Sequence, residues 1–240
     1  MSVPTLRIEN LTLGFKTYAG MSDVLHGISL HISKGERVAL VGESGSGKTV
    51  TMKAIMGLLR EPPAKITSGR ILYDGADLLT MPAAERLKLR GTAMSMVFQD
   101  PMSALNPVFT IRDQMGTILK YADKRLGRAR SSRDRLARVH EVLEQVRMRD
   151  PERVSRSYPI ELSGGMRQRI LIAMALLSEP KLLIADEPGT ALDVTTQAQI
   201  LKLLKDLVQA RGLALLMITH NLGVVRETSD HVYVMNKGVV

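Results

Sequence analysis

The fold is decided by the stretch Gly42-Glu43-Ser44-Gly45-Ser46-Gly47-Lys48-Thr49, which matches the pattern G-x-x-x-x-G-K-[ST] of a phosphate-binding loop (P-loop). Residues 37–41 before it are predicted to form a short buried strand, and residues 50–59 after it have the apolar period of a helix. A true P-loop has a strand before it and a helix after it, and both are predicted here. We therefore prefer a phosphate site to a chance glycine-serine turn.

The chemistry of the P-loop follows from its residue types. Glycines allow successive backbone N–H groups to curve around an anion, and the following helix directs its positive end to the same point. Lys48 adds a full positive charge for the β- and γ-phosphates, and the Thr49 hydroxyl can bind Mg²⁺.

Composition indicates a globular chain that folds without disulfides. The 240 residues are 45% apolar, contain no cysteine and are only 3% aromatic, so aliphatic residues and methionine must form the core. The absence of cysteine excludes a disulfide framework and any cysteine-bound metal in this sequence. The longest apolar run, Ile170–Leu177, is far shorter than the roughly 20 residues of a membrane-spanning helix.

The chain carries an excess of positive charge, with a formal net charge of +9. Much of the excess is local, in a basic cluster of Lys124, Arg125, Arg128, Arg130, Arg133, Arg135 and Arg138. Such a cluster is usually a solvated helical face, although nucleic acid, an anionic membrane or an acidic partner is also compatible with it. No aromatic residue is interleaved with these cations for base stacking, so nucleic acid is not expected as a partner.

The order of the predicted elements indicates an α/β fold, a P-loop NTPase core with a mostly parallel sheet. An antiparallel β section comes first, with alternating strands at residues 6–13 and 24–32 and a loop at 14–20. Continuous apolar runs follow, as in parallel strands that are buried on both faces. We expect the core to include residues 1–99 and 161–240, with an inserted helical subdomain at residues 100–160 that is helical from Ile111 to about Arg149.

Four predicted buried strands end on residues with polar chemistry or on glycine, namely Gly42, Gln99, Asp186 with Glu187, and His220. In parallel α/β sheets the ligand lies at the carboxyl ends of the strands. There Asp186 is placed to hold Mg²⁺ opposite Thr49, and Glu187 to orient or deprotonate an attacking water. Gln99 can contact metal or water, and His220 can donate to the γ-phosphate. The simpler alternatives are that Asp186 and Glu187 form a helix cap, that Gln99 is a turn residue and that His220 is a core histidine with satisfied hydrogen bonds.

A second helix start also has the composition of an anion site. Ser163, Gly164 and Gly165 precede a periodic helix, where a serine cap and exposed N–H groups favour a phosphate. Two such helix starts with a single P-loop indicate a dimer, in which Ser163 and Gly165 of one subunit complete the site of the other.

Because of this segment and the other motifs, the chain resembles the nucleotide-binding subunits of ATP-binding cassette (ABC) transporters. The resemblance covers nearly all of residues 1–240. The matching motifs are the P-loop, the Q-loop Gln99, the signature Leu162–Met166 followed by Arg167-Gln168-Arg169, the Walker B strand Leu182–Asp186 with Glu187, the D-loop Ala191-Leu192-Asp193, and the H-loop His220. The segments Ile66–Gly69, Phe98–Met102 and Leu105–Pro107 resemble the dipeptide, oligopeptide and nickel importer group.

The resemblance implies an ATPase that uses Mg²⁺ and ATP at the interface of a head-to-tail dimer, with Asp193 near the dimer axis and Phe15, less surely Tyr18, stacked on adenine. The nucleotide contacts that it implies are Phe15, Gly42, Ser44, Gly45, Ser46, Gly47, Lys48, Thr49, Val50, Ser163, Gly164, Gly165 and Asp193. The metal contacts are Thr49, Gln99 and Asp186, and the catalytic residues are Glu187, His220 and Gln99. The partners are transmembrane permease subunits at the cytoplasmic face of the membrane, a second identical or similar ATPase subunit and, indirectly, an extracytoplasmic solute-binding protein.

The sequence departs from that group at two positions and at its end. Gly189 stands where threonine is usual, which predicts a looser D-loop, and Ile160 stands where histidine is usual. Members of the group usually continue beyond the position of Val240, so the sequence is compatible both with a natural end there and with a truncated chain. The alternatives are a soluble ABC ATPase that acts on nucleic acid and a regulatory cassette that binds ATP with little hydrolysis.

Overall fold

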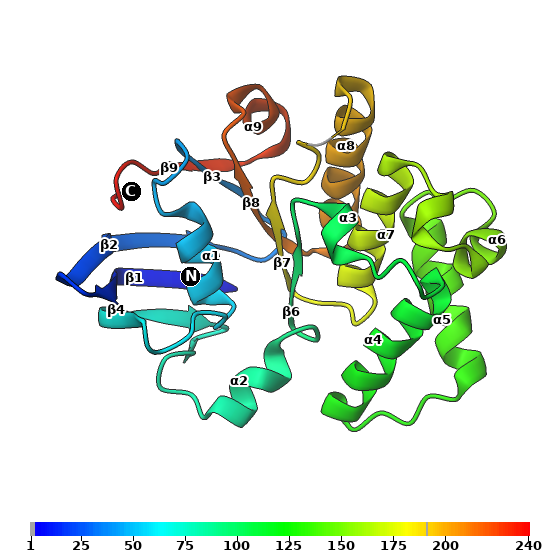
Figure 1. The fold of residues 1–240 in the computed structure, drawn as a ribbon, viewed down its shortest axis with the longest axis horizontal. Coiled ribbons are helices and arrows are strands. Elements are labelled where there is room, and N and C mark those ends of the chain that lie inside the picture. Colours follow the sequence, from blue (N-terminus) through cyan, green and yellow to red (C-terminus); the bar gives the residue numbers. More distant parts are fainter. Residues whose placement is uncertain (1–2, 191) are drawn as a thin grey trace. The chain divides into compact units, whose positions relative to one another are not determined.

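The computed structural model describes residues 3–190 and 192–240. They form two compact units (Figure 1). The first contains the chain up to Leu87 together with Val208–Val240, and the second contains Lys88–Leu207. The first unit therefore contains the P-loop, and the second contains the predicted helical subdomain and the signature motif.

The first unit contains a four-stranded antiparallel sheet in the order β2-β1-β4-β5, which confirms the predicted N-terminal β section. Its strands are β1 (Leu6–Thr17), β2 (Gly20–Ile32), β4 (Ala64–Tyr73) and β5 (Ala76–Asp77). Leu6 of β1 pairs with Ile32 of β2 and with Tyr73 of β4, and these side chains are buried. The prediction of a loop at residues 14–20 is wrong, because the ladder continues to the pair Thr17–Gly20 and only two residues turn.

Three parallel strands of the same unit position the P-loop. They are β3 (Arg37–Val41), β8 (Ala214–Thr219) and β9 (His231–Val234), with β3 in the middle. β3 and β8 are almost wholly buried, as their continuous apolar sequences predict. The helices of this unit are α1 (Lys48–Ile55), α2 (Ala83–Leu89) and α9 (Leu222–Thr228).

The second unit contains the parallel strand pair β6 (Met94–Val97) and β7 (Leu182–Asp186). Its other elements are α3 (Pro101–Ala104), α4 (Ile111–Leu126), α5 (Ser132–Gln145), α6 (Pro151–Arg156), the 3₁₀ helix η1 (Pro159–Glu161), α7 (Gly164–Leu176) and α8 (Val194–Arg211), whose last residues belong to the first unit. Helices α4, α5 and α6 gather beside α7 (Figure 1). Among the described residues, no helix combines the length and the apolar character needed to cross a membrane.

The segment predicted to be helical, Ile111 to about Arg149, forms two helices, because local signals divide it into α4 and α5. Gly127 ends α4 with a left-handed φ of 66°, which glycine adopts without steric cost. Ser131 then begins α5 with a capping box, in which its side chain accepts from the N–H of Asp134 and the Asp134 carboxylate accepts from Ser131 N.

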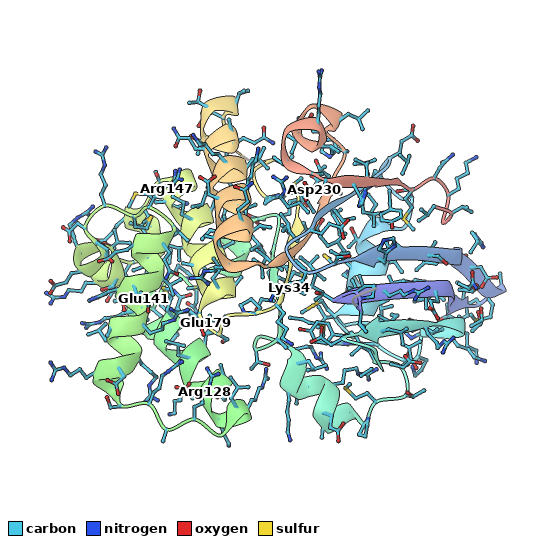
Figure 2. The ribbon with its side chains drawn as sticks, turned by 180° about the vertical axis from the view of Figure 1, so that it is seen from behind. Lys34, Arg128, Glu141, Arg147, Glu179 and Asp230 are labelled. Carbon is cyan, nitrogen blue, oxygen red and sulfur yellow. The ribbon has the colours of Figure 1, made fainter. Side chains whose placement is uncertain are left out.

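The basic cluster is partly an internal ion-pair network and not only a solvated face. Asp123 of α4 is 3% exposed, and its carboxylate lies 3.2 Å from Nη1 of Arg130 and 3.7 Å from Nη1 of Arg135. Arg138 forms ion pairs with Glu141 and Glu179, two of the labelled carboxylates (Figure 2). These pairs connect α4, α5 and the end of α7, so three of the seven cations have acidic partners within this unit.

Replacing Asp123 with asparagine is expected to lower the free energy of unfolding by about 2 kcal/mol. A buried ion pair that loses one partner typically costs more, but both arginine side chains are about a quarter exposed and water screens them. Denaturant unfolding measures the change, and Glu144→Gln on the exposed face of α5 is the control. Equal stability of the two variants would contradict a structural role for Asp123.

Candidate functional site

The P-loop surrounds the ammonium group of Lys48. Nζ of Lys48 donates to the carbonyl oxygens of Gly42 at 2.7 Å and Glu43 at 2.8 Å, and Ser46 Oγ lies at 3.4 Å. The lysine is only 8% exposed, whereas Thr49, the next residue of α1, is exposed. A buried cation held at the start of a helix therefore supplies the charge that a phosphate requires, with a hydroxyl beside it.

Two glycines of the loop are required by close packing. A Cβ on Gly42 would lie 2.1 Å from the carbonyl oxygen of Met235, and a Cβ on Gly47 would lie 2.8 Å from a methyl carbon of Leu25. Gly47 also has a φ of 110°, which favours glycine. The loop is thus fixed from outside by β2 and by the residue after β9.

His220 lies at the same end of the parallel strands as the P-loop. Val41 pairs with Thr219, so the residues that follow them, Gly42 and His220, leave the sheet at the same edge. Asn221 begins α9 by accepting from the N–H groups of Gly223 and Val224, which leaves His220 exposed between strand and helix. The register therefore supports the predicted placement of His220 near the phosphate loop.

Phe15 belongs to β1 and not to a loop. It is half-buried and pairs with Ser22 of β2 and Ala64 of β4. Two residues before it, Leu13 pairs with Leu25, the residue that packs against Gly47 of the P-loop. Tyr18, the weaker candidate for adenine stacking, lies at the fully exposed hairpin turn. The hairpin thus holds Phe15 close to the contact between β2 and the P-loop.

In the second unit, the ends of β6 and β7 bring Gln99 and Glu187 together. Val97 pairs with Ala185, so the polar residues that follow both strands share an edge. Nε2 of Gln99 donates to Oε2 of Glu187 at 3.1 Å, and the Thr190 hydroxyl donates to the same oxygen at 3.0 Å. Asp186, the last residue of β7, is half-buried beside them.

The residues after β7 form a tight turn. Glu187 has a left-handed φ of 46°, which is uncommon for a residue other than glycine. Gly189 has a φ of 153°, and its N–H donates to the carbonyl of Glu187 at 2.6 Å. The structure therefore gives Gly189 a defined, hydrogen-bonded conformation, and the expected looseness of the D-loop remains a prediction.

The signature motif begins α7 and packs against the residues after this turn. Ser163 caps α7 by accepting from the N–H of Met166 at 3.3 Å. A Cβ on Gly165 would lie 2.6 Å from Cγ2 of Thr196, so only glycine fits there without displacing the start of α8. A Cβ on Gly164 would lie 3.2 Å from Cδ2 of Leu192. The signature and the D-loop are therefore in direct contact within one chain.

Asp193 caps α8. Its carboxylate accepts from the N–H of Thr196 at 2.9 Å, and this backbone hydrogen bond lowers the pKa of Asp193 below its usual value. Asp193 is exposed, so a role at a dimer axis remains open to it. Ala191 of the predicted D-loop lies outside the described residues.

The predicted site residues thus form two groups. The first unit holds Phe15, the P-loop residues Gly42 to Val50 and His220, and the second holds Gln99, Asp186, Glu187, Ser163, Gly164, Gly165 and Asp193. Sequence reasoning missed Thr190, although a hydroxyl three residues after a carboxylate can reach it in a turn. It also missed Leu25 and Met235, because no local pattern indicates contacts between residues so distant in sequence.

The available donors suit Mg²⁺. The candidates Thr49, Gln99 and Asp186 offer a hydroxyl, an amide and a carboxylate, which are the oxygen donors that this ion prefers. Among residues 3–190 and 192–240, no group of three or more His, Cys, Asp or Glu is placed to hold a metal. Mg²⁺ usually keeps several waters and is held by one or two carboxylates together with phosphate oxygens.

The family model described as "ABC transporter" matches residues 25–190, which include the P-loop, Gln99, the signature and Glu187. The chain belongs to the ABC transporter family. Two solved ABC structures of similar fold support this. A dimeric, post-hydrolysis structure of the ATP-binding cassette MJ0796 with ADP and Pi has a TM-score of 0.83 and 30% identity, covering 98% of this chain and 96% of that one. CbiO1 of Clostridium perfringens, part of the ABC transporter complex cbiONQ, has a TM-score of 0.82 and 29% identity, covering 99% and 86%. The predicted α/β P-loop fold is therefore confirmed.

Similar members of the ABC transporter family are ATP-binding proteins of transport systems. YejF of Agrobacterium fabrum, a peptidoglycan transport ATP-binding protein, is 49% identical over 99% of this chain. DppD and OppD of Bacillus subtilis, for dipeptide and oligopeptide transport, are 47% and 45% identical over 97% and 98% of it. The chain spans 42% of YejF, 68% of DppD and 64% of OppD, so these relatives contain additional sequence.

Proposed function

We propose that this chain is the ATP-hydrolysing domain of an ABC importer. The proposed importer takes up peptides through a separate permease. The observation that carries the enzymatic part is the carboxylate of Glu187, held at the end of β7 by Gln99 and Thr190. A carboxylate fixed in this way is suited to accept a proton from an attacking water. Its position directly after Asp186 places the base one residue from a candidate metal contact.

In this proposal the P-loop binds the triphosphate. Backbone N–H groups of Gly42, Ser44, Gly45, Ser46 and Gly47 surround the β-phosphate, with Val50 in the first turn of α1. Lys48 leaves its loop carbonyls to contact the β- and γ-phosphates. Phe15 stacks on adenine. Thr49, Asp186 and Gln99 would hold Mg²⁺, which would stabilise negative charge on the phosphate oxygens when bound. His220 donates to the γ-phosphate.

The proposal includes a second subunit, identical or similar. Ser163 is exposed at the N-terminus of α7, a helix of 13 residues whose first N–H groups form an anion site. One chain carries one P-loop and one such helix start, so a head-to-tail pair completes two sites. The dimeric form of the MJ0796 cassette supports this arrangement.

The transport role rests on the relatives. YejF, DppD and OppD are named as peptidoglycan, dipeptide and oligopeptide transport proteins, so a peptide is the proposed solute. The proposed partners are transmembrane permease subunits at the cytoplasmic face of the membrane and, through them, an extracytoplasmic solute-binding protein. ATP closes the ATPase pair by contacting both subunits, and hydrolysis removes that bridge, so the pair opens.

Phosphate release from Mg²⁺-ATP tests the enzymatic part of the proposal. The expected result is turnover by the chain that stops when EDTA removes the metal and resumes when Mg²⁺ is added. ATP binding without turnover in the complete transporter would favour a regulatory cassette, and salt-sensitive binding to DNA would favour a role on nucleic acid. Cells that produce this chain with Glu187→Gln should take up less of a labelled oligopeptide than cells with the wild-type chain, whereas their uptake of nickel should be unchanged.

A further inference from the structure

One carboxylate oxygen of Glu187 accepts two hydrogen bonds. One donor precedes Glu187 in the chain, and the other follows it. Gln99 comes from the end of β6, and Thr190 comes from three residues further along the same turn. The amide donates at 3.1 Å and the hydroxyl at 3.0 Å, both to Oε2. A carboxylate with one oxygen fixed by two donors has lost most of its freedom to rotate, so its other oxygen is directed as well.

The turn that brings Thr190 to Glu187 depends on backbone conformations that few residues adopt. Glu187 has a φ of 46° and Gly189 a φ of 153°. The N–H groups of Gly189 and Thr190 both donate to the carbonyl of Glu187, at 2.6 and 3.3 Å. A Cβ on Gly189 would lie 3.1 Å from Cγ of Gln197. Glycine at this position therefore allows the chain to fold back, with the Thr190 hydroxyl on the carboxylate.

We propose that Thr190 is a positioning residue for Glu187 and that it acts only through this carboxylate. The inference rests on the proposed function, in which Glu187 accepts a proton from water as the water oxygen bonds to the γ-phosphorus and the bond to the β-phosphate oxygen breaks. The Thr190 hydroxyl fixes Oε2, so the rotamer that receives the proton is already selected when ATP binds. Positioning of this kind raises kcat without contributing to nucleotide affinity.

Thr190→Val removes the hydroxyl and keeps the shape of the side chain. Thr190 is exposed, so this variant and Thr190→Ser are both expected to fold. We expect Thr190→Val to lower kcat about tenfold, because a hydrogen bond to a charged group is lost. The KM and the dissociation constant for ATP should stay unchanged, and Thr190→Ser should recover most of the lost rate. An unchanged kcat, or a rise in KM with kcat preserved, would overturn the inference.

A second pair of variants tests whether Thr190 acts through Glu187. In single-turnover measurements, Thr190→Val should cause no additional loss when Glu187→Ala has already removed the carboxylate. The same tenfold loss in both backgrounds would mean that Thr190 contacts nucleotide or the partner directly, which would overturn the inference. A wild-type chain without ATPase activity would overturn the proposed function as well, so the two failures are distinguishable.

Discussion

Glu187→Gln is expected to lower kcat for ATP hydrolysis at least about 100-fold while ATP binding is retained, because an amide cannot accept the proton that the carboxylate accepts. The amide keeps the shape of the side chain and can still contact Gln99 and Thr190. The variant should therefore remain as a nucleotide-bound dimer, since the bridge between the subunits is no longer cleaved. Phosphate release and light scattering in the presence of ATP measure the two effects.

Glu179, a carboxylate that precedes β7, provides a control for this variant. It is exposed after α7, where it pairs with Arg138 and takes no part in the proposed site. Glu179→Gln should leave kcat and dimerisation as in the wild type. Wild-type turnover by Glu187→Gln would show that another group accepts the proton and would refute the assignment of Glu187.

Lys48→Ala is expected to weaken ATP binding about 100-fold, which corresponds to ~3 kcal/mol. The lysine is buried in the P-loop, and the substitution removes the ammonium group that donates to two loop carbonyl oxygens. The loss combines a missing charge-assisted hydrogen bond with repulsion of the triphosphate. Titration with ATP, followed by calorimetry, measures the dissociation constant.

Lys53→Ala is the matched control, because Lys53 lies in the last turn of the same helix and is exposed. Its affinity for ATP should stay within a factor of about two of the wild type, since screened surface charges contribute little. Equal losses for the two variants would indicate a general electrostatic effect and not a phosphate contact by Lys48.

The sequence was sufficient to predict the parts of the fold that have strong local signals. The buried strands β3, β7 and β8 and the helix after the P-loop are all present, because continuous apolar runs next to glycine-rich turns have few other interpretations. The segment 111–149 is helical as predicted, but it is divided into two helices. Gly127 and the Ser131–Asp134 capping box divide it, and both signals are visible in the sequence.

The sequence indicated candidate site residues but not the contacts that those residues make. The ends of predicted parallel strands pointed to Gln99 and Glu187 in the second unit and to His220 in the first, because ligands bind at the carboxyl ends of such strands. Side-chain partners were not predictable, since the hydrogen bond between Thr190 and Glu187 depends on backbone angles that sequence does not specify. The packing of Gly165 on Thr196 likewise joins segments that no local pattern connects.

In the proposed dimer, ATP binds between the P-loop of one subunit and the signature motif of the other. Mixing two inactive variants, Lys48→Ala and Ser163→Arg, tests it most directly. In a head-to-tail dimer the mixed pair has one site with both substitutions and one site with neither, so ATPase activity should return on mixing. A mixture that stays as inactive as each variant alone, although mixed dimers form, would contradict the claim.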